Sequence, residues 1–424
     1  MVAVTPSPSD RVFVRTTMTN HKKPRLRFFE ESPGQRHIVA PDRYLYGQGE
    51  PRYRLAIIGT GTIGQEHMRV ARLLGCATVH GVYDQNDRSA TVAIEEFVRQ
   101  GGDEPVRYKD LTAACNDADV DALMICTPNH THIQVFDVAA KSGKPIFLEK
   151  PMATTVADAR RIVELARNYP AFVQVGLQYR YKAPYVEAQH EVRERRSIGD
   201  VKTISMSEYR PPFLDKVDQW NKFAEFTGGT LVEKCCHYFD LMNLFADSTP
   251  ARVFASAGQA VNFVDFERDG KVSDIDDHAF VFIDYENGVR ADFTLNMFSP
   301  HFVEDLVICG DRGRLVASER FDFLQDDTAR SSVAIERGEE GASRVMDVGY
   351  ARTIEQSGHH GATFFEHMAF VDQLDGKTSD AATLLQGLWS IVVAAAAQES
   401  VTTGQPVVID TFIEQNDLLH ALES

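Results

Sequence analysis

A strand, a glycine turn and a helix follow one another near residue 60. An apolar run from Leu55 to Ile58 enters the pattern Gly59-x-Gly61-x-x-Gly64, and residues 65–74 have helical periodicity. The first glycine permits a tight turn, the second lets phosphates approach the backbone, and the third lets the helix pack closely on the strand. The helix N-terminus, which begins with Thr62 and Ile63, offers unpaired N–H groups to an anion. This order of elements predicts a dinucleotide-binding domain.

An acidic residue ends the next expected strand. Val79 to Val82 is an apolar run, and it is followed by Asp84, twenty residues beyond Gly64. A carboxylate there accepts hydrogen bonds from the ribose of the adenosine half and repels a 2′-phosphate. An Asp that only caps a loop is the alternative, and the strand–glycine–helix–strand context favours the nucleotide role. We therefore predict NAD in preference to NADP.

The alternation of strands and helices continues to Gly176. Expected helices cover residues 89–100, 131–142 and 156–168, with a helical turn after Asp110; expected strands lie near Val106 and over residues 121–126, 145–148 and 171–176. The run at 121–126 is continuously apolar, as strands buried on both faces are. The pattern predicts an α/β fold with a doubly wound parallel sheet, a Rossmann NAD-binding domain over residues 53–177.

Polar residues follow several of these strands. Because doubly wound sheets bind ligands at the carboxyl ends of their strands, we predict that these residues complete the cofactor site: Thr127, Pro128, Asn129, His132, Glu149, Lys150 and Gln178.

The alternation of expected strands and helices ends at Gly176. Residues 178–196 resemble one helix, Val201 to Tyr209 a strand and Leu231 to Phe245 a second helix, and closely spaced strands follow at 251–265, 277–285, 289–298, 302–310 and 313–317. Asn287-Gly288 is a hairpin signal between two of them. Residues 320–360, with Glu339, Glu340 and several glycines, indicate loop, and helices return at 363–374 and 381–400. This predicts a second α/β domain, residues 178–424, with a large, open and mostly antiparallel sheet.

A sheet covered by helices on one face needs another cover for its second face. We predict that a second copy of the chain supplies it, so that the protein is a homodimer or homotetramer.

Charge and composition limit the partners. The 424 residues carry a formal charge of −17, which argues against nucleic acid and anionic membranes. Residues 1–54 hold ten Lys and Arg against five Asp and Glu, so residues 1–52 form a basic extension or arm. We find no secretory signal and no apolar run of ~18 residues, and predict a cytoplasmic protein.

Six cysteines are too few for a disulfide scaffold. Cys76 and Cys126 lie in apolar runs and are interpreted as core residues. Cys235 and Cys236 precede His237, but no spacing typical of a metal site accompanies them, so we expect no metal.

Two segments carry groups suited to proton transfer. Lys150 follows a strand end beside the expected cofactor site and precedes Pro151, a bond that could be cis. A lysine there can lower the pKa of a substrate hydroxyl. Glu233 and His237 are four residues apart and would share one helix face, so that the carboxylate orients a histidine acting as base. An exposed helical Glu–His pair is an equally good interpretation of the second segment.

Several ordered motifs together resemble the Gfo/Idh/MocA oxidoreductases, which include glucose–fructose oxidoreductase and inositol dehydrogenases. The motifs are GTGTIG, Asp84, CTPNHTH, EKP and GG…E…H..D, and the resemblance covers residues 53 to about 400. It implies that Lys150 and His237 are catalytic and that position 233 carries a partner acid. The family usually has Asp and Gly where this chain has Glu233 and Cys235, which leaves the substrate open.

We therefore expect an oxidoreductase that transfers hydride between NAD and a secondary alcohol of a sugar, cyclitol or polyol. Two alternatives remain: tightly bound NAD used in a closed redox cycle, and a non-catalytic, NAD-responsive binding protein. Candidate substrate-binding residues are Tyr179 and Arg180 after the last strand, Trp220 and Asn221 in a loop, and His360 before a helix.

Overall fold

The computed structural model describes residues 51–326 and 328–423. The expected extension over residues 1–52 therefore lies almost entirely outside the described residues. The described residues form one compact unit that contains two large β-sheets and a small two-stranded one.

The first sheet has six parallel strands in the order β3-β2-β1-β4-β5-β6. This order, with the crossover at β1 and β4, is that of a dinucleotide-binding fold. The strands are β1 (Tyr53–Ile58), β2 (Ala77–Tyr83), β3 (Val106–Arg107), β4 (Ala122–Ile125), β5 (Ile146–Glu149) and β6 (Val173–Gly176). The connecting helices are α1 (Thr62–Leu74), α2 (Asp87–Arg99), α3 (Leu111–Asn116), α4 (His132–Ala139) and α5 (Val156–Ala166).

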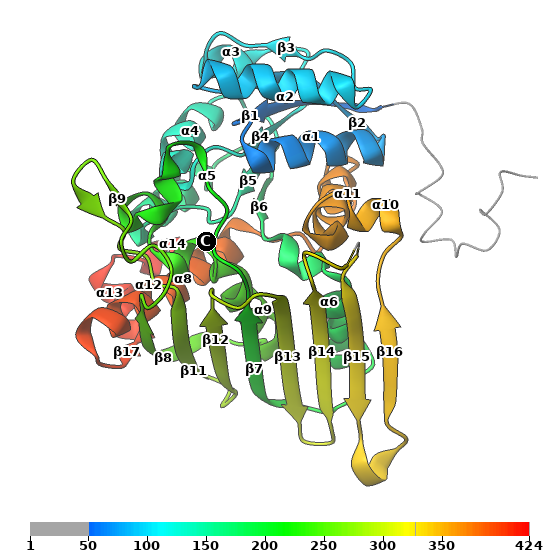
Figure 1. The fold of residues 1–424 in the computed structure, drawn as a ribbon, viewed down its shortest axis with the longest axis vertical. Helices are drawn as coiled ribbons and strands as arrows, with labels where there is room; N and C mark the ends of the chain where they lie inside the picture. Colours follow the sequence, from blue (N-terminus) through cyan, green and yellow to red (C-terminus); the bar gives the residue numbers. More distant parts are fainter. Residues whose placement is uncertain (1–50, 327, 424) are drawn as a thin grey trace, which may run out of the picture. The chain divides into compact units, whose positions relative to one another are not determined.

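The second sheet has nine strands side by side in the order β16-β15-β14-β13-β7-β12-β11-β8-β17 (Figure 1). Only β7 and β12 pair in parallel. The strands are β7 (Val201–Tyr209), β8 (Pro250–Gly258), β11 (His278–Tyr285), β12 (Arg290–Asn296), β13 (Phe302–Gly310), β14 (Arg314–Phe321), β15 (Arg330–Glu336), β16 (Arg344–Val348) and β17 (Val407–Val408). A separate hairpin joins β9 (Glu267–Arg268) to β10 (Lys271–Val272). The predicted α/β fold with a parallel and a mostly antiparallel sheet is confirmed.

Helices cover one face of the nine-stranded sheet, where side chains are buried at every second position. The helices of this part are α6 (Ala183–Gln189), α7 (Ala224–Thr227), α8 (Thr230–Glu233), α9 (Cys236–Ala246), α10 (Arg352–Glu355), α11 (Ala362–Leu374), α12 (Leu384–Thr403), α13 (Ile409–Gln415) and α14 (Leu419–Leu422). Among them, α12 is long and apolar enough to span a membrane by length and composition alone. It packs against β8, α9 and α5, as a core helix does.

Three expectations about local structure are wrong. Residues 178–196 are not one helix, because extended Lys182 separates a 3₁₀ turn (Gln178–Tyr181) from α6, where Pro184 lacks an N–H donor. Residues 231–245 form two helices, α8 and α9, with a break at Lys234 and Cys235. Residues 320–360 are not mainly loop, because β15 and β16 extend the sheet there. The expected hairpin at Asn287-Gly288 does join β11 to β12, with Gly288 at φ +90°.

Candidate active site

The glycine turn after β1 leaves room for a ligand at one glycine only. A Cβ on Gly59 would lie 2.6 Å from the Cys126 carbonyl carbon, and a Cβ on Gly64 would lie 2.0 Å from the Gly59 carbonyl oxygen. Gly61, by contrast, has no described protein atom within 4 Å of its Cβ position apart from its own chain neighbours. The turn is therefore closed by packing at its two ends and open where α1 begins, at Thr62 and Ile63, so it can hold a pyrophosphate.

Asp84 supports this turn from the end of β2. Its Oδ2 atom accepts hydrogen bonds from the Thr60 backbone N–H (2.7 Å) and from the Thr60 hydroxyl (3.0 Å), while Oδ1 accepts one from the Asn86 N–H (2.8 Å). The carboxylate is half-buried. It thus braces the glycine turn and also lies where the ribose of a bound dinucleotide would reach it.

Several predicted residues have a buried polar atom with no hydrogen-bond partner among the described residues. A buried polar atom without a partner costs free energy, and a ligand that supplies the missing bond is one explanation. The atoms are Nδ2 of Asn129, Oε1 of Gln178, Oδ1 of Asn221, Oε2 of Glu233 and Nδ1 of His237. Together with the open turn at Gly61, these atoms fit a cofactor and a polyhydroxyl substrate.

Three other predicted cofactor residues make contacts within the protein. Both ring nitrogens of His132 lie within 3.0 Å of backbone carbonyl oxygens, those of Pro151 and Thr127, and Thr127 and Thr131 share a hydroxyl hydrogen bond. Glu149 is buried, and its Oε1 lies 2.7 Å from Nε2 of His67. His132 and Glu149 therefore hold the loops that follow β4 and β5 in place.

Lys150 stands at the carboxyl end of β5, and its bond to Pro151 is cis. Its backbone N–H donates to the Glu149 carboxylate at 2.9 Å. The positive charge of Lys150 lowers the pKa of both His237 and Glu233, although burial is the largest influence on each. The lysine therefore acts on both groups that were predicted to accompany it.

His237 lies near the start of α9 and is 2% exposed. Its ring stacks on the ring of Tyr179, with centroids 4.0 Å apart. Burial, and then the charges of Lys150 and Lys234, hold the pKa of His237 well below its ordinary value. The imidazole is therefore neutral near pH 7 and can accept a proton.

Glu233 ends α8 and is 8% exposed. Burial raises its pKa to about 7, against the opposing charges of Lys150 and Lys216. Since the chain breaks at Lys234 and Cys235, Glu233 and His237 do not share one continuous helix, and the helix-face argument for pairing them does not apply. Both nevertheless lie within the electrostatic reach of Lys150.

The candidate substrate residues divide into two groups. Tyr179 contacts His237 and accepts a hydrogen bond from Lys234 Nζ at 2.6 Å. Trp220 is half-buried and lies against the ring of His130, with centroids 6.1 Å apart. Arg180 instead forms a buried bidentate ion pair with Asp240, and His360 bonds Glu319 at 2.8 Å. The side chains of Arg180 and His360 are therefore already bound to carboxylates of the protein.

Sequence reasoning missed several buried ionisable groups around this site. Glu66 and His67 directly follow the glycine pattern, and His67 lies 2.6 Å from His367 of α11. Near Tyr179, Lys182 forms ion pairs with Glu304 of β13 and Glu319 of β14, whose side chains are buried. The only sequence signal was the charge of Glu304 and Glu319 at positions where the strand alternation calls for apolar residues.

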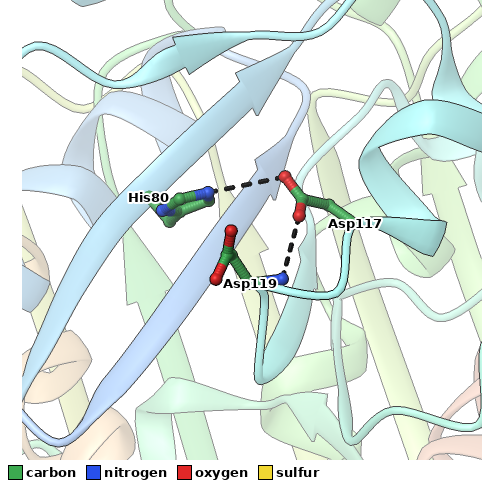
Figure 2. Close-up of side chains that lie close together, drawn as sticks. All are labelled: His80, Asp117 and Asp119. Carbon is green, nitrogen blue, oxygen red and sulfur yellow. Dashed lines mark hydrogen bonds and ion pairs between the residues drawn. The ribbon is translucent and has the colours of Figure 1, made fainter.

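One group of described side chains has the proximity that a metal site needs: His80, Asp117 and Asp119 (Figure 2). His80 Nε2 lies 3.4 Å from Asp117 Oδ2, and the Asp119 N–H donates to Asp117. Asp117 also accepts from the Tyr108 hydroxyl, and Asp119 pairs with Arg54. These protein contacts explain the cluster without a metal ion. All six cysteines are free thiols; Cys126 is buried as expected, whereas Cys76 is half-buried.

Two family models match the chain. An oxidoreductase family with an NAD-binding Rossmann fold matches residues 53–177, and the C-terminal alpha/beta domain of the same oxidoreductase family matches residues 193–409. Among curated relatives, an inositol 2-dehydrogenase of Paracoccus denitrificans is 38% identical over 143 residues, which is 33% of this chain and 41% of that protein. The scyllo-inositol 2-dehydrogenase (NAD(+)) of Bacillus subtilis is 23% identical over 85% of this chain and 97% of its own length.

Solved structures share the fold. A probable dehydrogenase from Thermotoga maritima has a TM-score of 0.68 at 21% identity, covering 85% of this chain and 100% of that chain. A levoglucosan dehydrogenase in complex with NADH has a TM-score of 0.69 at 18% identity, covering 84% and 99%. At these identities the likeness extends to the arrangement of helices and strands.

Proposed function

Because the chain belongs to the oxidoreductase family with an NAD-binding Rossmann fold and its C-terminal alpha/beta domain, we propose that it is an NAD-dependent cyclitol dehydrogenase. Membership of the Gfo/Idh/MocA family, the oxidoreductase class and NAD as cofactor, all predicted from the ordered motifs, are thereby confirmed. The substrate and the roles of individual residues are the content of the proposal.

The observation that carries the proposal is that Glu233 and His237 each keep a buried polar atom without a hydrogen-bond partner among the described residues, while the charge of Lys150 lies near enough to act on both. Bound NAD supplies a hydride acceptor. Neutral His237 takes the proton of the substrate hydroxyl, and the ammonium of Lys150 stabilises the developing alkoxide. Glu233 binds a second hydroxyl or stabilises the imidazolium that His237 becomes.

The names of the relatives support the substrate class. Several curated relatives are named inositol 2-dehydrogenases, and one of them is matched over 97% of its length. An inositol presents a secondary hydroxyl on every ring carbon, which suits a site with several unpartnered polar atoms. The cytoplasmic location remains a prediction from the sequence.

We also propose that the protein assembles as a homodimer or homotetramer through the outer face of the nine-stranded sheet. Phe254, Phe280 and Phe282 are 39%, 50% and 54% exposed on this face. Phe254 and Phe282 are directly opposed on β8 and β11. An exposed aromatic group of this kind on a sheet face favours burial against a second copy.

The test is NADH absorbance on mixing the purified protein with NAD or NADP and a panel of inositols, aldoses, uronates and anhydrosugars. We expect sustained NADH formation with an inositol and NAD. Lys150→Met and His237→Ala should each lower turnover by roughly 10²–10⁴-fold while NAD still binds. Lys141→Met, which removes an exposed lysine paired with Asp137, is the matched control and should leave turnover unchanged.

Other outcomes would replace the proposal. Released, stoichiometric NAD(H) without turnover would favour a closed redox cycle. Tight NAD binding with neither turnover nor a change on adding any cyclitol would favour a binding protein.

A further inference from the structure

Two consecutive histidines before α11 have a backbone conformation that residues other than glycine rarely adopt. His359 has φ +42° and His360 has φ +52°, and they lie between Gly358 (φ +152°) and Gly361 (φ +89°). Such a conformation costs free energy and persists only where surrounding contacts hold it, most often at functional sites. The contacts that hold each histidine therefore indicate what the segment does.

His359 is held by the helix that starts at the glycine turn. Its Nδ1 atom lies 2.7 Å from Oε1 of Glu66 in α1, and the Thr363 hydroxyl donates to the same oxygen at 2.6 Å. Glu66 is buried, and His359 and Thr363 hold its pKa down at about 2, so the carboxylate is ionised. A Cβ on Gly358 would lie 2.1 Å from the Glu66 carboxyl carbon, so this contact requires glycine there.

An ionised carboxylate fixes the orientation of the imidazole. Because Glu66 can only accept, Nδ1 of His359 carries the proton in this bond. Nε2, the other ring nitrogen, has no hydrogen-bond partner among residues 51–326 and 328–423. The side chain is 29% exposed, so a ligand can reach it.

The position of His359 connects it to the catalytic site. Its ring centroid lies 6.4 Å from that of Tyr179, whose ring also stacks on that of His237. The charge of His359 also acts on His237. His360 turns away to Glu319 and to the rings of Phe302 and Phe321.

We propose that His359, oriented by Glu66, is a substrate-binding residue whose Nε2 forms a hydrogen bond with a second hydroxyl of the substrate. The inference rests on the proposed dehydrogenase function and adds a specificity-determining contact to it. Since Glu66 belongs to the nucleotide-binding helix, the contact connects the substrate to the same helix that receives the cofactor.

The experiment compares wild type with His359→Asn and His359→Ala. Asparagine tolerates a positive φ, and its amide can replace Nδ1 in the bond to Glu66, but it has no atom at the Nε2 position. We expect His359→Asn to keep the melting temperature and the NAD affinity of wild type while its KM for the inositol rises at least tenfold. His359→Ala should show the same rise in KM and a lower melting temperature.

Deoxyinositols give a readout that a purely structural role would not move. In wild type, the analogue that lacks the contacted hydroxyl should have a raised KM, and in His359→Asn that analogue and the parent inositol should differ little. An unchanged KM in a folded His359→Asn variant, with wild-type turnover intact, would overturn the inference alone. Absence of wild-type turnover on every cyclitol would overturn the proposed function, and the inference with it.

Discussion

The imidazole of His237 and the phenol ring of Tyr179 are stacked, with centroids 4.0 Å apart and ring planes 10° apart. The two residues come from different elements, α9 and the 3₁₀ turn after β6. Lys234 donates to the Tyr179 hydroxyl at 2.6 Å and forms an ion pair with Glu208 at 3.0 Å. The Tyr179 ring of the stack is therefore itself held in place. The stack fixes the plane of the His237 imidazole.

Tyr179→Phe and Tyr179→Leu separate the ring from its hydroxyl. Phe keeps the stack and should retain kcat/KM within about threefold. Leu fills the space without a planar ring, and an aromatic pair is worth about 0.5–1.5 kcal/mol. We therefore expect kcat/KM to fall up to about tenfold, measured by NADH formation. Equal activity of the two variants would show that the stack does not position His237.

The raised pKa of Glu233 predicts a pH dependence of the reaction. If the ionised carboxylate supports His237, kcat/KM should rise with pH through about 7, where Glu233 titrates in the free enzyme. His237 is neutral over this range because its pKa lies well below the ordinary value. Glu233→Gln should lower the plateau and remove this limb of the pH profile; retention of the limb would assign it to another group.

The same pKa predicts the pH dependence of stability. The pKa of Glu233 is raised to about 7 in the folded protein, above the value of about 4.3 for an unfolded chain. The folded state thus binds the proton more tightly, so this contribution is full below pH about 4 and is lost as the pH rises to 7. In denaturant titrations, Glu233→Gln should show a smaller decrease in the free energy of unfolding between pH 5 and 7 than wild type.

Patterns along the chain predicted the parallel domain well because its signals are local. The glycine spacing, the apolar runs and the residues at strand ends are each set by a few neighbouring positions, and β1, α1 and β4 lie within about two residues of their expected bounds. The second domain was harder. The break between α8 and α9 falls at Lys234 and Cys235, where no Gly or Pro marks a helix end, and β15 and β16 are stabilised by pairing with β14 and with each other rather than by their own apolar content.

The missed site residues have a common physical reason. His359 contacts Glu66 across 293 residues of the chain, and Thr363 contacts it across 297. No periodicity or spacing reports a hydrogen bond over such a separation. Nothing in the sequence distinguishes the adjacent His359 and His360; the backbone at positive φ turns one to Glu66 and the other to Glu319.

Substitution by alanine should have different effects at two glycines of the turn. Gly61→Ala meets no described protein atom within 4 Å and has an ordinary φ of −67°, so it should fold like wild type and bind NAD at least tenfold more weakly. Gly64→Ala places Cβ 2.0 Å from the Gly59 carbonyl oxygen and should destabilise the fold by about 1–3 kcal/mol. Thermal unfolding and NAD titration measure the two effects. Unchanged NAD affinity in Gly61→Ala would place the pyrophosphate elsewhere.

The outer sheet face should control assembly. Phe280 and Phe282 are half-exposed on β11, opposite Thr294 and Asp292 of β12, so lysines at both positions are compatible with the strand pairing. Burying two charged side chains in an interface is unfavourable, and the lysine at position 280 would face Thr294 rather than a carboxylate, so Phe280→Lys combined with Phe282→Lys should convert the oligomer to monomers in sedimentation experiments. Val92→Lys, at an exposed valine of α2, is the matched control and should leave the mass unchanged. An oligomer of wild-type mass in the double variant would show that assembly uses a different surface.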